Sequence, residues 1–220
     1  EKITLALAHT LEKSKHLVTL AVLNSSRNTL IVDPSIEYID LNIDAKFAFG
    51  KLWKFKELST KELQNFSSLI NKRNFDLIII GFHNGYYLGK YLTQKENIWY
   101  WIHGDLLEIR NFNNPLKRIK EHIRFFKNKR KFSKLFKGKN LITVNRDLEE
   151  KAKIYTQPNK TTTIANGIEL PKDLINSSKS TIKNWDVIFV GRLVPIKQVD
   201  HAIKAFAMSN ICGKMAIVGD

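Results

Sequence analysis

The chain has 220 residues, of which 43% are hydrophobic and 26% charged, and its 36 Lys and Arg against 21 Asp and Glu give a formal net charge of +15. A single cysteine, Cys212, excludes an internal disulfide and a cysteine-based metal cluster. No stretch approaches the ~18 apolar residues of a membrane-spanning helix, and the first residues lack the long apolar core and cleavage site of a signal peptide. Cytoplasmic residence is the simplest inference.

Short apolar runs alternate with helical patterns along the chain, which is typical of βαβ units and a parallel sheet. The first helical pattern begins at once, with Ile3, Leu7 and Leu11 at helical spacing. We expect helices at 2–13, 60–72, 86–93, 116–136, 147–155 and 198–208. We expect strands at 17–23, 36–41, 76–80, 98–102, 141–144, 162–165, 187–190 and 215–218.

The first candidate site follows the aromatic strand 98–102, where His103, Gly104 and Asp105 come directly after the apolar run. Open α/β sheets bind ligands at the carboxyl ends of their strands, so His103 is a candidate catalytic residue. A satisfied structural histidine is the alternative. Gly104 would allow close backbone approach, and Asp105 would either bind hydroxyl groups of a ligand or cap a turn.

Other candidates for the same cleft follow neighbouring strands. They are His83, Asn145 and Asn166. The histidines show no metal-ligand spacing with one another or with Cys212, so we expect no metal.

A strongly basic segment lies between Leu116 and Lys139, where eleven Lys or Arg stand against Glu121 alone. The segment carries +10 of the net +15. Apolar residues also recur on one face of the expected helix, at Leu116, Ile119, Ile123 and Phe126. A basic helix with an apolar face suits an anionic membrane surface, where each basic residue contributes about 1 kcal/mol. The candidates for this contact are Lys117, Arg118, Arg124, Phe125, Lys127, Lys129, Arg130, Lys131 and Phe132.

Two alternatives remain open for this segment. It could be a core helix with a solvated basic face. This core role and the membrane role could also coexist, with Ile119 and Ile123 buried while the phenylalanines face lipid. Nucleic-acid binding is the other alternative that the charge suggests. No nucleic-acid-binding motif is present, and the rest of the chain carries only +5, so we expect no nucleic-acid partner.

The second candidate site follows the apolar strand 187–190. Gly191 lets the backbone turn, Arg192 and Lys197 lie on the loop, and a helical pattern begins directly afterwards. Cations at the carboxyl end of a parallel strand, beside a helix N-terminus, suit a phosphate or diphosphate. The alternative is a surface loop that happens to be basic.

The run Gly191-Arg-Leu-Val-Pro-Ile-Lys197 resembles the second domain of the retaining glycosyltransferases of family 4, which have the GT-B fold. Weaker matches lie in the expected order at 101–105, 143–145 and 164–168, although Ala165 stands where that family usually has proline. The resemblance implies a Rossmann-like, acceptor-side N-terminal domain at 1–168, a linker at 169–184 and the start of a nucleotide-sugar-binding domain at 185–220. It also implies a fragment that lacks the first strand, its glycine-rich loop and most of the C-terminal domain.

In that family, the histidine matching His103 faces the donor sugar, and the cations matching Arg192 and Lys197 hold the diphosphate of a UDP-, GDP- or ADP-sugar without a metal ion. The resemblance therefore implies a hexosyltransferase that retains the anomeric configuration of the sugar and acts on a lipopolysaccharide or capsule precursor. It also implies a peripheral location at the inner face of the cytoplasmic membrane. Two donor-site glutamates of the family would lie beyond Asp220, so we expect no turnover by the 220 residues alone. A GT-B sugar-nucleotide epimerase and a non-catalytic membrane-associated adaptor are the alternatives.

Overall fold

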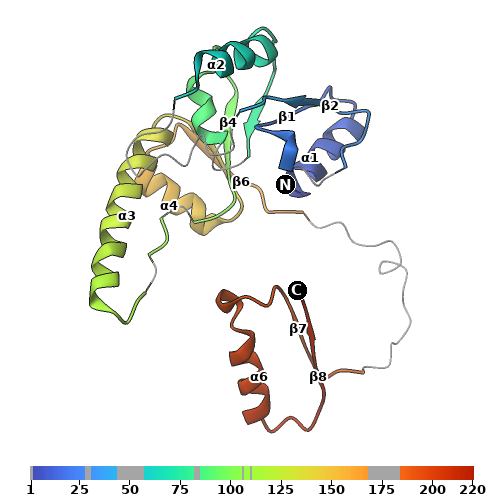
Figure 1. Ribbon diagram of the computed structural model, residues 1–220, viewed down its shortest axis with the longest axis vertical. Helices are drawn as coiled ribbons and strands as arrows, with labels where there is room; N and C mark the ends of the chain where they lie inside the picture. The colour runs from blue at the N-terminus through green and yellow to red at the C-terminus, as the bar shows by residue number, and fades with distance from the viewer. Residues whose placement is uncertain are drawn as a thin grey trace. The chain divides into compact units, whose positions relative to one another are not determined.

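The computed structural model describes residues 2–27, 31–43, 57–81, 85–105, 107–109, 111–167 and 184–220. The chain divides into two compact units, Glu1–Ile168 and Glu169–Asp220 (Figure 1). Both are mixed α/β structures whose described strand pairs are all parallel. This architecture is compatible with a Rossmann-like fold. The candidate His83 and the expected linker up to residue 183 lie outside the described residues.

A four-stranded parallel sheet forms the centre of the first unit, in the order β3-β4-β5-β6. Ile102 pairs with Thr143, and Thr143 pairs with Thr163, so the carboxyl ends of three strands lie level at one edge. A second, separate sheet is the parallel pair β1-β2. The strands of this unit are β1 (Thr19–Val22), β2 (Glu37–Asp40), β3 (Ile78–Ile80), β4 (Ile98–Ile102), β5 (Asn140–Thr143) and β6 (Lys160–Thr163).

The helices α2, α3 and α4 of the first unit begin at side-chain caps that the sequence supplies. Ser59 and Glu62 form a capping box at the start of α2, Asn114 caps α3 ahead of Pro115, and Asn145 caps α4. Each cap satisfies backbone N–H groups that the first helical turn leaves without a partner. The helices are α1 (Lys2–Lys13), α2 (Thr60–Phe66), α3 (Pro115–Phe136) and α4 (Arg146–Thr156).

Two expected helices differ in type from the prediction. The pattern at 60–72 is α2 followed by a π-helical turn at Ser67–Asn71, and the pattern at 86–93 is a 3-10 helix at Gly85–Lys90. The latter packs closely on β4, because a Cβ at Gly89 would lie 2.1 Å from the Tyr100 hydroxyl oxygen. The expected strand at 162–165 is β6 at Lys160–Thr163, since Asn140 and Lys160 already pair.

An aromatic cluster joins α3 and the 3-10 helix to the central strand β4. The Phe136 ring meets Tyr86 and Tyr100 edge-on, at centroid distances of 5.4 and 5.6 Å, and stacks on Phe132 at 6.0 Å. The buried Tyr86 hydroxyl donates a 2.7 Å hydrogen bond to the Trp101 carbonyl oxygen. The cluster thereby fixes the strand that directly precedes His103.

The second unit is a single βαβ arrangement. Strands β7 (Val187–Val190) and β8 (Met215–Val218) pair in parallel. The connection contains a 3-10 turn at Pro195–Lys197 and the helix α6 (Val199–Met208). The two strands and α6 were expected within one residue of these bounds.

We predict that Phe136→Ala lowers the free energy of unfolding by about 3–5 kcal/mol, because it removes a fully buried aromatic ring and leaves a cavity. The matched control is Phe126→Ala on the same helix. Phe126 is 65% exposed, so its loss should change stability by no more than about 0.5 kcal/mol. Guanidinium unfolding followed by circular dichroism measures both. Equal losses would contradict the assignment of the inward face of α3.

Candidate functional site

His103 lies at the carboxyl edge of the four-stranded sheet, directly after β4. Its half-buried ring packs on Trp101, with centroids 4.5 Å apart and planes inclined at 39°. Burial lowers the pKa of His103 from its ordinary value of 6.5, and a side-chain hydrogen bond with Asn166 partly opposes this effect. The ring is therefore mainly neutral at pH 7, so one nitrogen is a donor and the other an acceptor.

Among the candidates that lie far apart in the sequence, Asn166 is near enough to His103 to affect the pKa of its ring. Asn145, another of the described candidates, has a different role. Its side-chain oxygen accepts a 2.8 Å hydrogen bond from the Leu148 backbone N–H and caps α4. Gly104 faces open space, because a Cβ built there would meet nothing within 4 Å.

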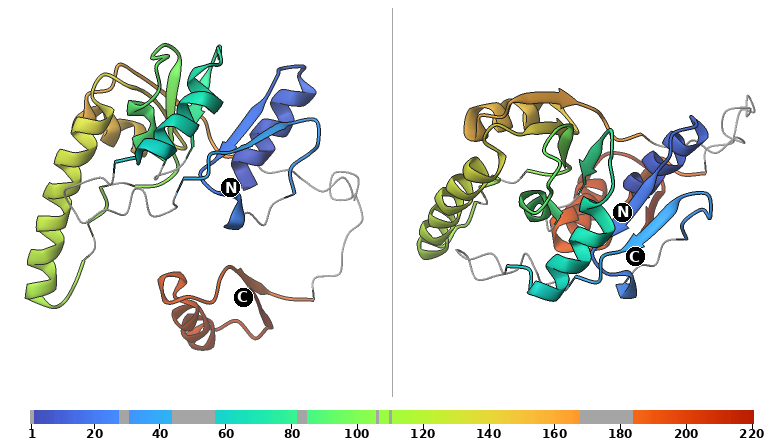
Figure 2. Two further views of the ribbon diagram at one scale, coloured as in Figure 1. Left: turned by 45° about the horizontal axis from the view of Figure 1, so that its top comes forward. Right: turned by 90° about the horizontal axis from the view of Figure 1, so that it is seen from above.

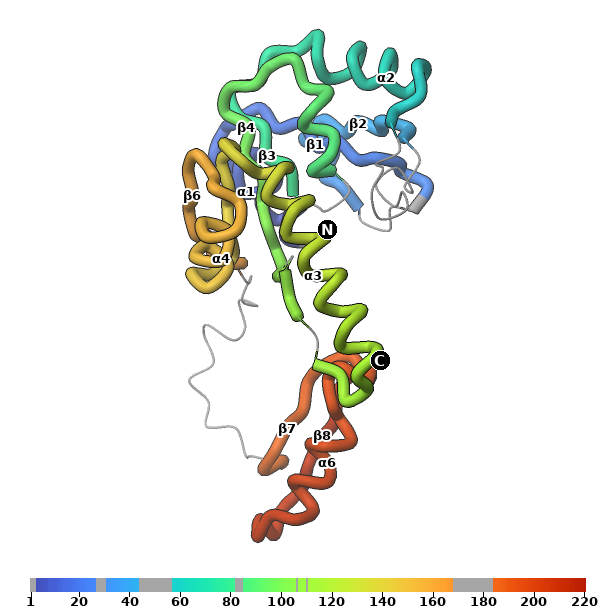
Figure 3. The backbone as a smooth tube through the Cα atoms, turned by 90° about the vertical axis from the view of Figure 1, so that its left-hand side faces the viewer, coloured from blue at the N-terminus to red at the C-terminus, as the bar shows by residue number. Residues whose placement is uncertain are grey.

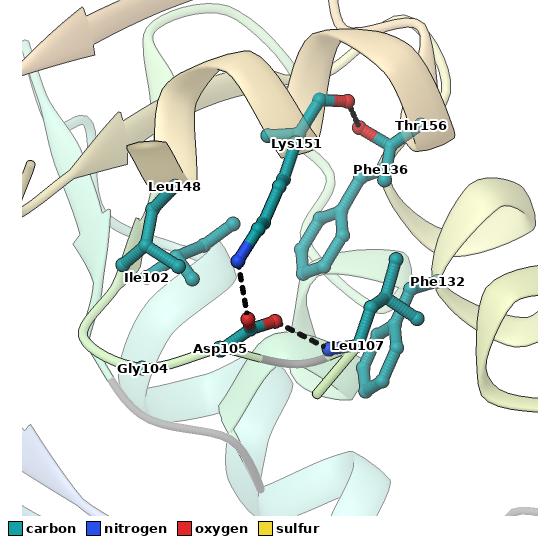
Figure 4. Close-up of a pocket in the computed structure, with 10 residues that line it drawn as sticks. Ile102, Gly104, Asp105, Leu107, Phe132, Phe136, Leu148, Lys151 and Thr156 are labelled. Atoms are coloured by element: carbon teal, nitrogen blue, oxygen red, sulfur yellow. Dashed lines mark hydrogen bonds and ion pairs between the residues drawn. The ribbon is translucent and has the colours of Figure 1, made fainter. Parts of the chain in front are cut away.

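Asp105 ties the loop after β4 to helix α4 (Figure 4). One carboxylate oxygen accepts from the Leu107 backbone N–H at 2.9 Å, and the other pairs with the Lys151 ammonium at 2.8 Å. Lys151 also pairs with Asp147 at 3.0 Å, and hydrogen bonding to the two carboxylates raises the pKa of Lys151. Of the two expected roles of Asp105, its side chain performs the turn cap.

Lys151 was not predicted as a site residue. The spacing of Asp147 and Lys151 along α4 signals an ion pair within the helix. Nothing in the sequence signals the contact with Asp105.

A small hollow, partly open to solvent, lies beside this ion pair. Its floor is apolar and aromatic, and the carboxylate of Asp105 and the ammonium of Lys151 are its charged groups (Figure 4). The lining residues are Ile102, Gly104, Asp105, Leu107, Phe132, Phe136, Leu148, Lys151, Ala152 and Thr156.

Gly191 lies where strands β7 and β8 end. Its backbone N–H bonds to the Val218 carbonyl oxygen at 2.9 Å, and a Cβ at Gly219 would lie 1.8 Å from the Gly191 carbonyl oxygen. Only glycine at position 219 permits this approach of the two backbones.

Arg192 and Lys197 are exposed on the connection between β7 and α6. Lys197 ends the 3-10 turn, and Gln198 leads directly into α6. Neither cation forms an ion pair within the described ranges. The second unit thus presents two free cations after the carboxyl end of a parallel strand, next to a helix N-terminus.

Helix α3 carries apolar residues on two opposite sides, since about 3.6 residues complete a turn. Phe132 and Phe136 point into the core, and Phe125 packs edge-on against Tyr155 with centroids 6.1 Å apart. The other side is exposed, with Ile119 at 57% and Ile123 at 48%. We call this exposed set, Leu116, Ile119, Ile123 and Phe126, the outer stripe.

This arrangement excludes the alternative in which Ile119 and Ile123 are buried while the phenylalanines face lipid, because both isoleucines are exposed and, of the phenylalanines on α3, Phe126 alone is exposed. Phe132 is 2% exposed and belongs to the core. The N-terminal half of α3 extends away from the sheet, while its C-terminal half lies beside α4 (Figures 1 and 2). Figure 3 shows the same end of α3 extending beyond α4. The outer stripe lies on this projecting half, so it contributes little to the core.

Several of the basic candidates on α3 are engaged within the fold. Arg124 forms an ion pair with the buried carboxylate of Glu121 and donates to the Glu108 carbonyl oxygen. The ammonium of Lys129 lies 5.0 Å from the centre of the Tyr155 ring, and the ammonium of Lys131 lies 5.1 Å from the centre of the Tyr87 ring. Burial lowers the pKa of Lys131. The basic candidates that remain exposed are Lys117, Arg118 and Arg130, while Lys127 is half-buried.

No protein-family model matches this chain, and no curated protein matches it significantly. In the part of the chain that the structure describes, no helix is long and apolar enough to cross a membrane. Within those same residues, His, Cys, Asp and Glu side chains form no group of three that could hold a metal ion.

We predict that His103 titrates below 6.5 in the folded chain and at a higher pH in guanidinium, because burial disfavours the charged ring. Proton binding is then weaker in the folded state, so lowering the pH through this range destabilises the fold. An NMR titration of the ring resonances measures both values. A folded midpoint equal to or above the unfolded one would contradict the prediction.

Proposed function

We propose that this chain is part of a GT-B-type hexosyltransferase, which moves a sugar from a nucleotide-sugar to a cell-envelope glycan acceptor with retention of configuration. The observation that carries the proposal is the pair of free cations, Arg192 and Lys197, at the end of β7. A glycosidic bond to a nucleotide breaks as negative charge accumulates on the diphosphate. Fixed cations at that group stabilise the transition state.

The two cations suit different parts of the task. The planar guanidinium of Arg192 can engage two phosphate oxygens at once, whereas the ammonium of Lys197 acts as a mobile point charge. Together they would supply the positive charge that a divalent ion supplies in other transferases. We therefore propose a UDP-, GDP- or ADP-sugar as donor.

His103 is proposed to contact the transferred sugar. Its ring is half-buried, its pKa is lowered by burial, and Gly104 beside it faces open space. A neutral imidazole accepts a hydrogen bond from a sugar hydroxyl through its unprotonated nitrogen. This role is one of orientation and requires no proton transfer at neutral pH.

An anionic membrane surface is proposed as the partner that brings the enzyme to a lipid-linked acceptor of the lipopolysaccharide or capsule type. The outer stripe of α3 supplies the apolar contact, and Arg130 and Lys134 continue the same side of the helix with positive charge. Apolar insertion and attraction to anionic lipid thus act from one face. The protein would lie at the inner face of the cytoplasmic membrane.

We predict that Arg192→Ala and Lys197→Ala each weaken nucleotide-sugar binding roughly ten- to a hundredfold, which corresponds to a lost charge-assisted hydrogen bond of about 1.5–3 kcal/mol. Calorimetric titration with UDP-, GDP- and ADP-sugars measures the loss. Lys204→Ala on α6 removes the same charge from an exposed site and should bind like the wild type. Wild-type affinity in both loop variants would show that the diphosphate assignment is wrong.

A second prediction concerns the outer stripe. Ile119→Ser with Ile123→Ser should weaken binding to anionic vesicles about tenfold or more, because two half-exposed aliphatic side chains no longer insert. Co-sedimentation with vesicles containing phosphatidylglycerol measures this loss. The wild type should bind neutral vesicles less and should release anionic ones as salt is raised.

The matched control is Ile154→Ser, at a 72% exposed isoleucine on α4. It should leave vesicle binding unchanged. An equal loss in the control would contradict the assignment of the contact to α3. Salt-independent binding to neutral and anionic vesicles alike would contradict its electrostatic part.

A further inference from the structure

The chain that follows β4 is held at two points by cations from two different helices. We call its described residues between 103 and 109 the β4 loop. Near the start of the loop, the ammonium of Lys151 on α4 lies 2.8 Å from a carboxylate oxygen of Asp105. Three residues later, the guanidinium of Arg124 on α3 donates a 2.9 Å hydrogen bond to the carbonyl oxygen of Glu108. The loop is therefore anchored to both helices.

The guanidinium of Arg124 is held in a fixed orientation by a buried carboxylate. The Glu121 side chain is 8% exposed, and its two oxygens accept from two different nitrogens of Arg124, one of them Nε at 2.8 Å. Such a two-pronged pair sets the plane of the guanidinium. The second nitrogen, Nη2, has two N–H groups and donates to Glu108 as well. Leaving Glu121 buried without its partner would be unfavourable, so Arg124 stays in place.

Leu107, which lies between the two anchors, ties the loop to the core. Its side chain packs against the core cluster and lines the hollow together with Phe132 and Phe136. Its backbone N–H donates to the second carboxylate oxygen of Asp105 at 2.9 Å (Figure 4). The carboxylate of Asp105 thus joins Lys151 to the backbone of the loop.

The backbone at Gly104 has little support of its own. A Cβ built there would meet nothing within 4 Å, and glycine adopts a wider range of backbone angles than other residues. We propose that Lys151 and Arg124 are positioning residues, which hold the β4 loop and thereby keep the backbone next to His103 in one arrangement. The Lys151–Asp105 pair is partly exposed and therefore weak alone, so the arrangement depends on both anchors together.

The test is the hydrogen-exchange rate of the Leu107 backbone N–H, measured by NMR in the full chain. Lys151→Met removes the first anchor, and Arg124→Met with Glu121→Gln removes the second without leaving a buried carboxylate unpaired. Each change should speed exchange about two- to fivefold. All three substitutions together should exceed the product of these effects, because each anchor limits the movement that loss of the other allows. Lys151→Arg should restore the wild-type rate.

Two matched controls keep both anchors. Lys153→Met removes an ammonium from the same helix, where it pairs with Glu149 at 2.7 Å. Glu121→Gln alone keeps the bond from Arg124 to Glu108. Both controls should leave exchange at Leu107 as in the wild type.

The N–H of Leu141, which is fully buried in β5, reports on unfolding of the whole unit. A wild-type rate at Leu107 in the triple variant would overturn the proposal. Equal acceleration at Leu107 and Leu141 would also overturn it, because the substitutions would then act on the whole fold and not on the loop.

The positioning role bears on catalysis only through the proposed function, and a binding measurement separates the two. If His103 holds the sugar, the triple variant should bind the intact nucleotide-sugar several-fold more weakly and the free nucleoside diphosphate like the wild type. Faster exchange at Leu107 with both affinities unchanged would support the positioning role and overturn the sugar contact. Unaltered exchange overturns the positioning role whatever the affinities.

Discussion

The first unit depends on the packing of aromatic rings against β4. Tyr100 and Phe136 meet edge-on, and the hydroxyl of Tyr86 satisfies the Trp101 carbonyl from the neighbouring 3-10 helix. An edge-on geometry has a preferred direction, so these contacts fix orientation as well as burial. The strand that precedes His103 is thereby held by α3 and the 3-10 helix, so the loop after this strand starts from a fixed position.

Two contacts hold the start of the chain that follows this strand. Trp101 supports the imidazole of His103, and Lys151 anchors the loop through Asp105. They come from β4 and α4, respectively. A site assembled in this way keeps its geometry through the packing of the sheet and its helices, which is why Asp105 and Lys151, 46 positions apart, meet.

Continuous apolar runs made the strands predictable. The runs 98–102 and 187–190 are strands at the expected bounds. The first, β4, is buried almost throughout, and a strand covered on both faces needs no polar alternation. Helical spacing could not show which side of α3 faces inward, since both sides carry large apolar residues. Phe132 and Phe136 are buried because they reach Tyr100 and its neighbours, and Ile119 and Ile123 are exposed because they lie beyond the sheet. Lys151 could not be predicted as a site residue, because its contact with Asp105 depends on where α4 packs in the fold.

The projecting half of α3 also has a consequence for the solubility of the chain. Four large apolar side chains on one exposed surface favour self-association, and the net charge of +15 keeps copies apart. Counterions weaken that repulsion without covering the apolar atoms, so concentrated solutions are best dispersed at low ionic strength. The repulsion between copies opposes precipitation only while the basic residues keep their charge. Modification that neutralises the lysines would therefore favour aggregation through this apolar surface.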